Sequence, residues 1–168
     1  MDLHHLTQLI DIKCLELANA CIEKKIRLVT AESCTGGLLA GYLINVSGAS
    51  NFLEGGFITY SNEMKNHVLN VSAATLLQYG AVSQETAIEM ARGALKKAYA
   101  ANLAIAATGI AGPSGGTYTK PVGLVWLAVY CKKTAQFKTN TFNFSGNRKI
   151  IRLQTVLEGL KLAKEIIN

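Results

Sequence analysis

The chain has 168 residues, of which 49% are hydrophobic and 17% are charged. These proportions exclude an intrinsically disordered chain and predict one globular domain over residues 1–168. The longest clearly apolar run, residues 124–131, is far shorter than the ~18 residues of a membrane-spanning helix. The N-terminus lacks the basic start, apolar stretch and cleavage site of a signal peptide. We therefore expect a cytoplasmic protein with no membrane partner.

The formal net charge is +6, which attracts anions to the surface. The lysines are scattered along the chain, and no basic segment is interleaved with aromatic residues, so no nucleic-acid partner is expected. The four cysteines form no C-x-x-C pair and have no histidine cluster beside them. They are interpreted as buried core residues, and no metal site is expected.

Apolar residues at helical spacing predict a first helix from Leu6 to Cys21. A buried strand is expected over residues 26–31, followed by a helix over 38–44. A pair of glycines, Gly55 and Gly56, precedes a second expected strand over 57–60. Two short helices are then predicted over residues 62–69 and 73–79.

Ser83 is a suitable N-cap for a longer helix that reaches Ala98. A third strand is expected over residues 103–107, and a glycine-rich loop follows over 109–116. Residues 123–131 and 135–144 are predicted to pair as a hairpin, and a last helix ends the chain. The alternation of strands and helices predicts an α/β fold, a three-layer α/β/α sandwich with a mixed, mostly parallel sheet.

The first segment that could carry chemistry is the loop over residues 30–37, between a strand and a helix. Ser33 lies in it, close to the free N–H groups of a helix start, which can stabilise an oxyanion or hold a phosphate. The alternative is an ordinary N-cap with glycines for a tight turn. The loop is not a G-x-S-x-G elbow, because Ala31 and Thr35 occupy the glycine positions.

The second segment, residues 59–65, contains Tyr60 and Lys65. A serine hydroxyl is a weak nucleophile unless a base takes its proton, and no histidine is suitably placed. A lysine can act as that base if burial or a nearby cation lowers its pKa from ~10.4 toward 7–8. The alternatives are a surface lysine and a strand-end aromatic residue. The spacing differs from the S-x-x-K pattern.

The third segment, residues 107–116, contains Thr108 and Gly109 in a glycine-rich loop that can present backbone N–H groups to an anion. It is neither a G-x-G-x-x-G nor a Walker A loop, and ordinary turns use the same residues. Arg148, at the start of the last helix, could add a guanidinium for a phosphate or carboxylate.

Taken together, these segments resemble the CinA C-terminal domain family, whose members include nicotinamide mononucleotide amidases. The resemblance spans roughly residues 8–165. It rests on AESCTGG at 31–37, GAS at 48–50, YSN at 60–62 with Lys65, GAVS at 80–83, TGIAGP at 108–113, KPVG at 120–123 and GNR at 146–148.

The resemblance implies a serine amidohydrolase that converts nicotinamide mononucleotide to nicotinic acid mononucleotide and ammonia, in pyridine nucleotide recycling and without a cofactor. It assigns the nucleophile to Ser33 and proton transfer to Tyr60 and Lys65. The implied substrate-binding residues are Thr35, Gly36, Gly37, Thr108, Gly109 and Arg148. The chain begins directly in this domain and so resembles the stand-alone type. The expected partners are a nucleotide substrate and a second copy in a homodimer.

Three other interpretations compete with this one. A non-catalytic nucleotide-binding or regulatory module would keep the glycine loop and Arg148 but would not need Lys65. A Tyr/Lys dehydrogenase needs Y-x-x-x-K and a dinucleotide fingerprint, and neither occurs. A cysteine hydrolase could use Cys34, because a thiolate is the better nucleophile, but it would lack a histidine partner.

Overall fold

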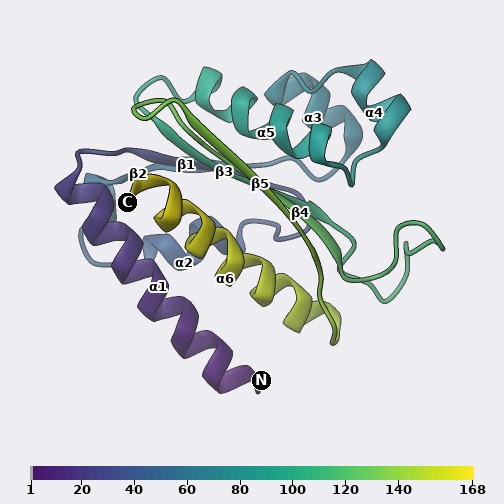
Figure 1. Cartoon of the computed structure of the whole chain (residues 1–168), viewed down its shortest axis with the longest axis horizontal. Helices are drawn as coiled ribbons and strands as arrows, with labels where there is room; N and C mark the ends of the chain where they lie inside the picture. Colours follow the sequence, from purple (N-terminus) through teal and green to yellow (C-terminus); the bar gives the residue numbers. More distant parts are fainter. Residues whose placement is uncertain (1) are drawn as a thin grey trace.

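The computed structural model describes residues 2–168 and contains a five-stranded sheet with helices on both faces (Figure 1). The strands are β1 (Leu28–Glu32), β2 (Leu53–Ile58), β3 (Leu103–Gly109), β4 (Leu124–Cys131) and β5 (Gln136–Asn143), in the order β2-β1-β3-β4-β5. Four strands run the same way, and β4 is antiparallel to both of its neighbours. The mixed, mostly parallel sheet is thereby confirmed.

The two helical layers are made from different parts of the chain (Figure 1). One face carries α1 (Leu3–Glu23), α2 (Leu38–Ile44) and α6 (Arg148–Ile167), and the other carries α3 (Asn62–Leu69), α4 (Ala73–Tyr79) and α5 (Gln84–Lys97). A short 3-10 turn, η1 (Ala49–Asn51), precedes β2. This is the predicted three-layer sandwich. No helix within residues 2–168 is long and apolar enough to cross a membrane.

The central strands β1 and β3 are buried almost throughout, because helices cover both of their faces. This explains why they appear in the sequence as continuous runs of small and apolar residues rather than as alternating patterns. The four cysteines are free and buried in this interior, which confirms their interpretation as core residues.

Strand β2 begins at Leu53, earlier than predicted, and includes Gly55 and Gly56. The prediction that the glycines precede the strand is therefore wrong. A Cβ at Gly56 would come within 2.4 Å of Thr30 Oγ1 and 3.1 Å of the Ala40 side chain. The glycine thus permits close packing of β2 against β1 and α2, which is a recognised role of glycine within strands.

The sheet topology determines where the three candidate site loops lie, over residues 30–37, 59–65 and 107–116. Strands β2, β1 and β3 are adjacent and parallel, with Glu32 in register with both Ile58 and Ala107. Their carboxyl ends therefore share one edge of the sheet, where ligand sites of α/β proteins usually occur. The loops that follow Glu32, Ile58 and Gly109 meet at this edge.

Candidate active site

Ser33 immediately follows β1, and its backbone N–H donates to Ala107 O at 2.9 Å. This bond extends the β1–β3 ladder by one residue and fixes the start of the loop. The chain then turns through Gly36 and Gly37, whose φ values of 58° and 92° are left-handed, a conformation that favours glycine. The Ser33 side chain lies at a cavity of about 230 Å³.

The cavity is formed by the three loops together with the turn after α4 and the start of α6. Its lining residues are Ser33, Cys34, Tyr60, Lys65, Ala81, Val82, Thr108, Gly109, Ala111 and Arg148.

Lys65 lies on α3, whose first turn is capped by the Ser61 hydroxyl. Although it is a lysine, its side chain is fully buried. Its Nζ donates to Ser33 Oγ at 2.9 Å, to Thr59 O at 2.9 Å and to Tyr60 O at 3.0 Å. Burial lowers the pKa of Lys65 to about 8, because removal from water disfavours the charged form.

These three contacts determine how the neutral amine would be oriented. A neutral amine has two N–H donors and one lone pair, whereas a backbone carbonyl can only accept. The carbonyls of Thr59 and Tyr60 therefore take both N–H groups, and the lone pair is left facing Ser33 Oγ. In this form the Ser33 hydroxyl donates to Lys65, which is the arrangement that a general base requires.

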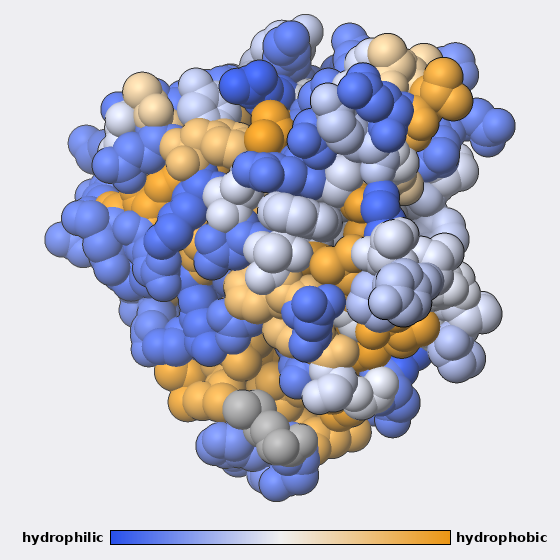
Figure 2. All heavy atoms as spheres, turned by 45° about the vertical axis from the view of Figure 1, so that its right-hand side comes forward, coloured by the Kyte–Doolittle hydropathy of each residue, from blue (hydrophilic) through white to orange (hydrophobic). Residues whose placement is uncertain are grey.

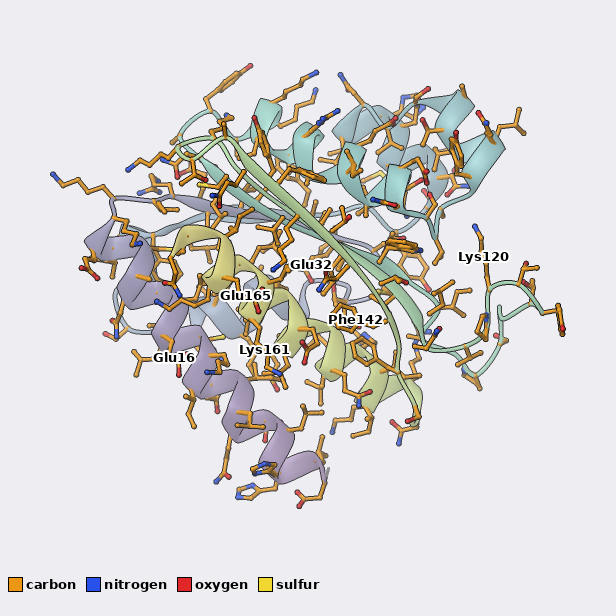
Figure 3. All side chains as sticks on the ribbon, viewed as in Figure 1. Glu16, Glu32, Lys120, Phe142, Lys161 and Glu165 are labelled. Carbon is orange, nitrogen blue, oxygen red and sulfur yellow. The ribbon has the colours of Figure 1, made fainter. Side chains whose placement is uncertain are left out.

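Glu32 is a site residue that the sequence analysis missed. It is completely buried, and Figure 3 shows it in the interior, between the sheet and the helices of one face. Its carboxylate accepts hydrogen bonds from the amides of Gly37, Leu39 and Ala40 at 2.9–3.1 Å and from the Thr30 hydroxyl at 3.0 Å. The chain thus provides its own anion at the start of α2.

This arrangement changes the expectation for Thr35, Gly36 and Gly37. The Gly37 amide is bound to Glu32, and the Gly36 amide donates to Ser33 O at 3.2 Å. Thr35 is fully buried, and none of the three residues lines the cavity. The expected oxyanion donors of Gly36 and Gly37 are therefore already used within the protein, and these residues shape the loop instead.

Thr108 and Gly109 line the cavity, and each also has a structural role. The Thr108 hydroxyl donates to Ala81 O at 2.7 Å. This bond holds the turn after α4, which lines the cavity through Ala81 and Val82. Lys120 holds the same turn through Tyr79 O and Val82 O (Figure 3). A Cβ at Gly109 would come within 2.6 Å of the Val125 side chain, so glycine permits the close approach to β4.

Tyr60 and Arg148 lie at the mouth of the cavity. The backbone carbonyl of Tyr60 contacts Lys65, whereas its ring is 63% exposed. Arg148 donates to the Tyr60 hydroxyl at 3.4 Å and to Gly112 O at 2.9 Å. Within residues 2–168, no hydrogen bond joins the Tyr60 hydroxyl to Ser33 or Lys65. The structure therefore pairs the phenol with Arg148 rather than with the nucleophile.

Cys34 lines the cavity beside Ser33 and is the alternative nucleophile. Burial raises the pKa of the Cys34 thiol to about 12. A thiol in this environment remains protonated near neutral pH and is a poor nucleophile. Ser33, which contacts Lys65, is therefore the better candidate for the nucleophile than Cys34.

Arg152 is a second residue that sequence reasoning missed. It lies one helical turn after Arg148, and its guanidinium donates to Cys34 O at 3.0 Å and Thr35 O at 2.6 Å. It therefore holds the loop that follows the nucleophile. The i, i+4 spacing of two arginines at the start of a predicted helix was the available signal.

The family model of the CinA C-terminal domain matches residues 13–167. A competence-damage inducible protein of Clostridium botulinum is 49% identical over 144 residues, which cover 86% of this chain and 34% of that protein. The chain thus spans 34% of the length of this curated relative.

Two solved structures have the same fold. A competence/damage inducible protein from Agrobacterium tumefaciens is 41% identical, with a TM-score of 0.89 and coverage of 92% of this chain and 93% of that one. A CinA superfamily protein from Klebsiella pneumoniae is 37% identical, with a TM-score of 0.89 and coverage of 94% and 97%. The chain belongs to the CinA C-terminal domain family.

Proposed function

We propose that the protein is an amidohydrolase that deamidates nicotinamide mononucleotide, with Ser33 as the nucleophile and Lys65 as the base. The observation that carries this proposal is the Lys65 amine, fully buried at 2.9 Å from Ser33 Oγ. A surface lysine would stay charged and could not accept a proton. A buried lysine whose pKa is about 8 is partly neutral under ordinary conditions.

In the proposed reaction, Ser33 Oγ forms a bond to the carboxamide carbon while its proton passes to Lys65. The C–N bond of the tetrahedral intermediate then breaks, and Lys65 returns the proton to the departing nitrogen, which leaves as ammonia. Water attacks the resulting acyl ester, again with Lys65 taking its proton. Ser33 receives a proton as the acid departs, so the enzyme regains its starting state.

The developing oxyanion needs a donor at the cavity. We assign this role to the backbone N–H of Cys34, because Cys34 lines the cavity and directly follows the nucleophile. Serine hydrolases with a strand-to-helix nucleophile turn use the equivalent N–H. One such donor is typically worth about 3–4 kcal/mol of transition-state stabilisation.

The nucleotide part of the substrate is assigned to the mouth of the cavity. Arg148 is exposed there, and its guanidinium contacts only Gly112 O and the Tyr60 hydroxyl within residues 2–168. Neither partner is an anion, so the charge of Arg148 is available to a phosphate. Tyr60 and Arg148 together would contact a substrate whose carboxamide reaches Ser33.

The test is an ammonia-release assay with nicotinamide mononucleotide, run beside nicotinamide and nicotinamide riboside. We expect turnover of the mononucleotide, loss of turnover in Ser33→Ala, and retained turnover in Cys34→Ala as the matched control. Activity that survives in Ser33→Ala but disappears in Cys34→Ala would overturn the assignment. Binding of the mononucleotide without turnover in the unmodified protein would favour a nucleotide-binding module.

A further inference from the structure

A second and larger cavity, of about 820 Å³, adjoins the catalytic cavity at Arg148. It is a groove between the starts of α1 and α6 and the helix α2, and apolar surface gathers around the start of α1 at the foot of Figure 2. We call it the α1–α6 groove. Its lining residues are Leu3, His4, Thr7, Leu38, Tyr42, Arg148, Lys149, Arg152 and Leu153.

The charged residues of the α1–α6 groove are all basic. Arg148, Lys149 and Arg152 contribute three basic side chains, and no lining residue is acidic. None of the four ion pairs within residues 2–168 includes these three side chains. The two guanidinium groups contact only backbone carbonyls and the Tyr60 hydroxyl. Their positive charge is therefore not neutralised by the protein.

The other lining residues are His4, Thr7 and an apolar group that includes Leu38, Tyr42 and Leu153. A groove with an apolar part and a strongly basic part matches a ligand that has an apolar body and an anionic group. Its volume is within the range of about 300–1,000 Å³ that is usual for small-molecule sites. Guanidinium groups match phosphate geometry particularly well, because they can donate two parallel hydrogen bonds.

We propose that the α1–α6 groove is a binding site for an organic phosphate, distinct from the catalytic cavity. The phosphate would contact Lys149 and Arg152, which line only this groove, and its apolar or aromatic body would lie on Leu38, Tyr42 and Leu153. The groove and the catalytic cavity share only Arg148. Arg152 reaches Cys34 O and Thr35 O from the groove side, so the loop after Ser33 forms the partition between the two cavities.

Lys149 is the residue that best tests the proposal. It is exposed, and it lines the groove but not the catalytic cavity. Arg148 and Arg152 are unsuitable, because the first lines both cavities and the second holds the catalytic loop. Lys97, exposed on α5 of the opposite face, offers the same change of charge as a control.

The experiment measures the binding of 1-naphthyl phosphate by titration calorimetry, beside 1-naphthol and inorganic phosphate. We expect the aryl phosphate to bind at least about tenfold more tightly than either fragment, because only it uses both parts of the groove. Lys149→Glu should weaken this binding by about tenfold or more, and Lys97→Glu by less than about twofold.

A second variant separates shape from charge. Thr7→Trp places a large side chain in the groove without changing its charge, and it should also weaken binding of the aryl phosphate. The proposal is overturned if 1-naphthyl phosphate does not bind, or if its affinity is the same in the unmodified protein, Lys149→Glu and Thr7→Trp. Equal weakening by Lys149→Glu and Lys97→Glu would also overturn it, since that pattern reports only net charge.

Discussion

The chemical character of Lys65 results from two opposing effects. Complete burial removes the water that would otherwise stabilise the charged ammonium. The charge interaction with the nearby Cys34 side chain raises the pKa of the amine and so favours the charged form. Desolvation is the larger effect, and the pKa is lowered to about 8 rather than raised. The result is a base that is partly neutral close to physiological pH, without help from a histidine.

This pKa predicts how activity depends on pH. If neutral Lys65 is the base, kcat/KM for nicotinamide mononucleotide should rise with pH through about 8 and level off above it. At pH 7 only about a tenth of the enzyme would have a neutral Lys65. Lys65→Arg should lose activity by orders of magnitude at every pH, because arginine does not deprotonate. A flat profile between about pH 6.5 and 9.5 would contradict the assignment.

Arg148 should act on substrate binding rather than on chemistry. We expect Arg148→Ala to raise KM for the mononucleotide by about tenfold or more and to have a smaller effect on a substrate without phosphate, because a guanidinium–phosphate pair contributes a few kcal/mol at most. Lys97→Ala, which removes an exposed cation on α5 of the opposite face, serves as the control. Steady-state kinetics on both substrates measure the difference, and equal effects on both would remove Arg148 from the phosphate site.

The sequence contained enough information to single out the Ser33 loop and Lys65 as candidates, because each stands in a recognisable motif. It did not reveal Glu32 and Arg152, whose main partners are backbone groups. Every residue has the same backbone groups, so the sequence does not show which of them a side chain will contact. Such contacts can be identified only from the fold. The position of the Tyr60 ring beside Arg148 depends on tertiary structure in the same way.

At the scale of elements, α2 depends on Glu32. The helix has seven residues, and its N-cap position is Gly37, which offers no side chain. Short helices are marginal without tertiary support, because nucleation is costly and their first amides lack partners. Glu32 supplies those partners from the end of β1 and joins the strand, the Ser33 turn and the helix into one unit.

Substitution of Glu32 should therefore affect both stability and catalysis. Glu32→Gln places an NH₂ group against backbone N–H donors and removes a buried charge, so we expect a loss of about 2–4 kcal/mol in the free energy of unfolding. We also expect a lower kcat with a smaller change in KM, because the Ser33 turn loses its anchor. Urea denaturation and steady-state kinetics measure both effects.

Glu165→Gln is the matched control, because Glu165 is exposed in a surface pair with Lys138. Surface pairs contribute about 0–1 kcal/mol, so this variant should be close to the unmodified protein in stability. Similar losses in the two variants would show that Glu32 has no special role in holding α2.

Local signals explain which elements were predicted well. The bounds predicted for α2, α3 and α4 coincide with the structure, and α3 and α4 begin after capping serines at 61 and 72. Strand β2 was predicted too short, because glycine is a turn signal in isolation. Its role at Gly56 depends on Thr30 and Ala40, which lie in other elements.

At the scale of the whole molecule, the strand order brings the site together. Strands β2, β1 and β3 are neighbours in the sheet, although both connections between them along the chain contain helices. The loops that follow these strands are therefore distant in sequence but lie at one edge of the sheet. The alternation of strands and helices predicted the layers. It did not predict the strand order, because that depends on which apolar faces pack together in three dimensions. The convergence of the three loops is therefore visible only in the fold.

The buried amine also has a consequence for the stability of the whole protein. The pKa of Lys65 is about 8 in the folded chain and 10.5 in the absence of burial. Between these values the unfolded chain binds more protons than the folded one, so stability rises with pH across this window. The buried Lys65 lowers the free energy of unfolding by its full amount below about pH 8, and this destabilisation disappears above about pH 10.5.

Lys65→Met removes this titration, and the variant should therefore not share the pH dependence. From about pH 7.5 to 9.5, the unmodified protein should gain about 2 kcal/mol in the free energy of unfolding relative to Lys65→Met. Comparing each protein with itself at two pH values separates this effect from the constant loss of hydrogen bonds to Thr59 O and Tyr60 O in the variant. Lys97→Met, in which an exposed lysine is replaced, should follow the unmodified protein. Urea denaturation of the three proteins at both pH values measures the difference, and parallel behaviour of all three would show that Lys65 titrates alike in the folded and unfolded chains.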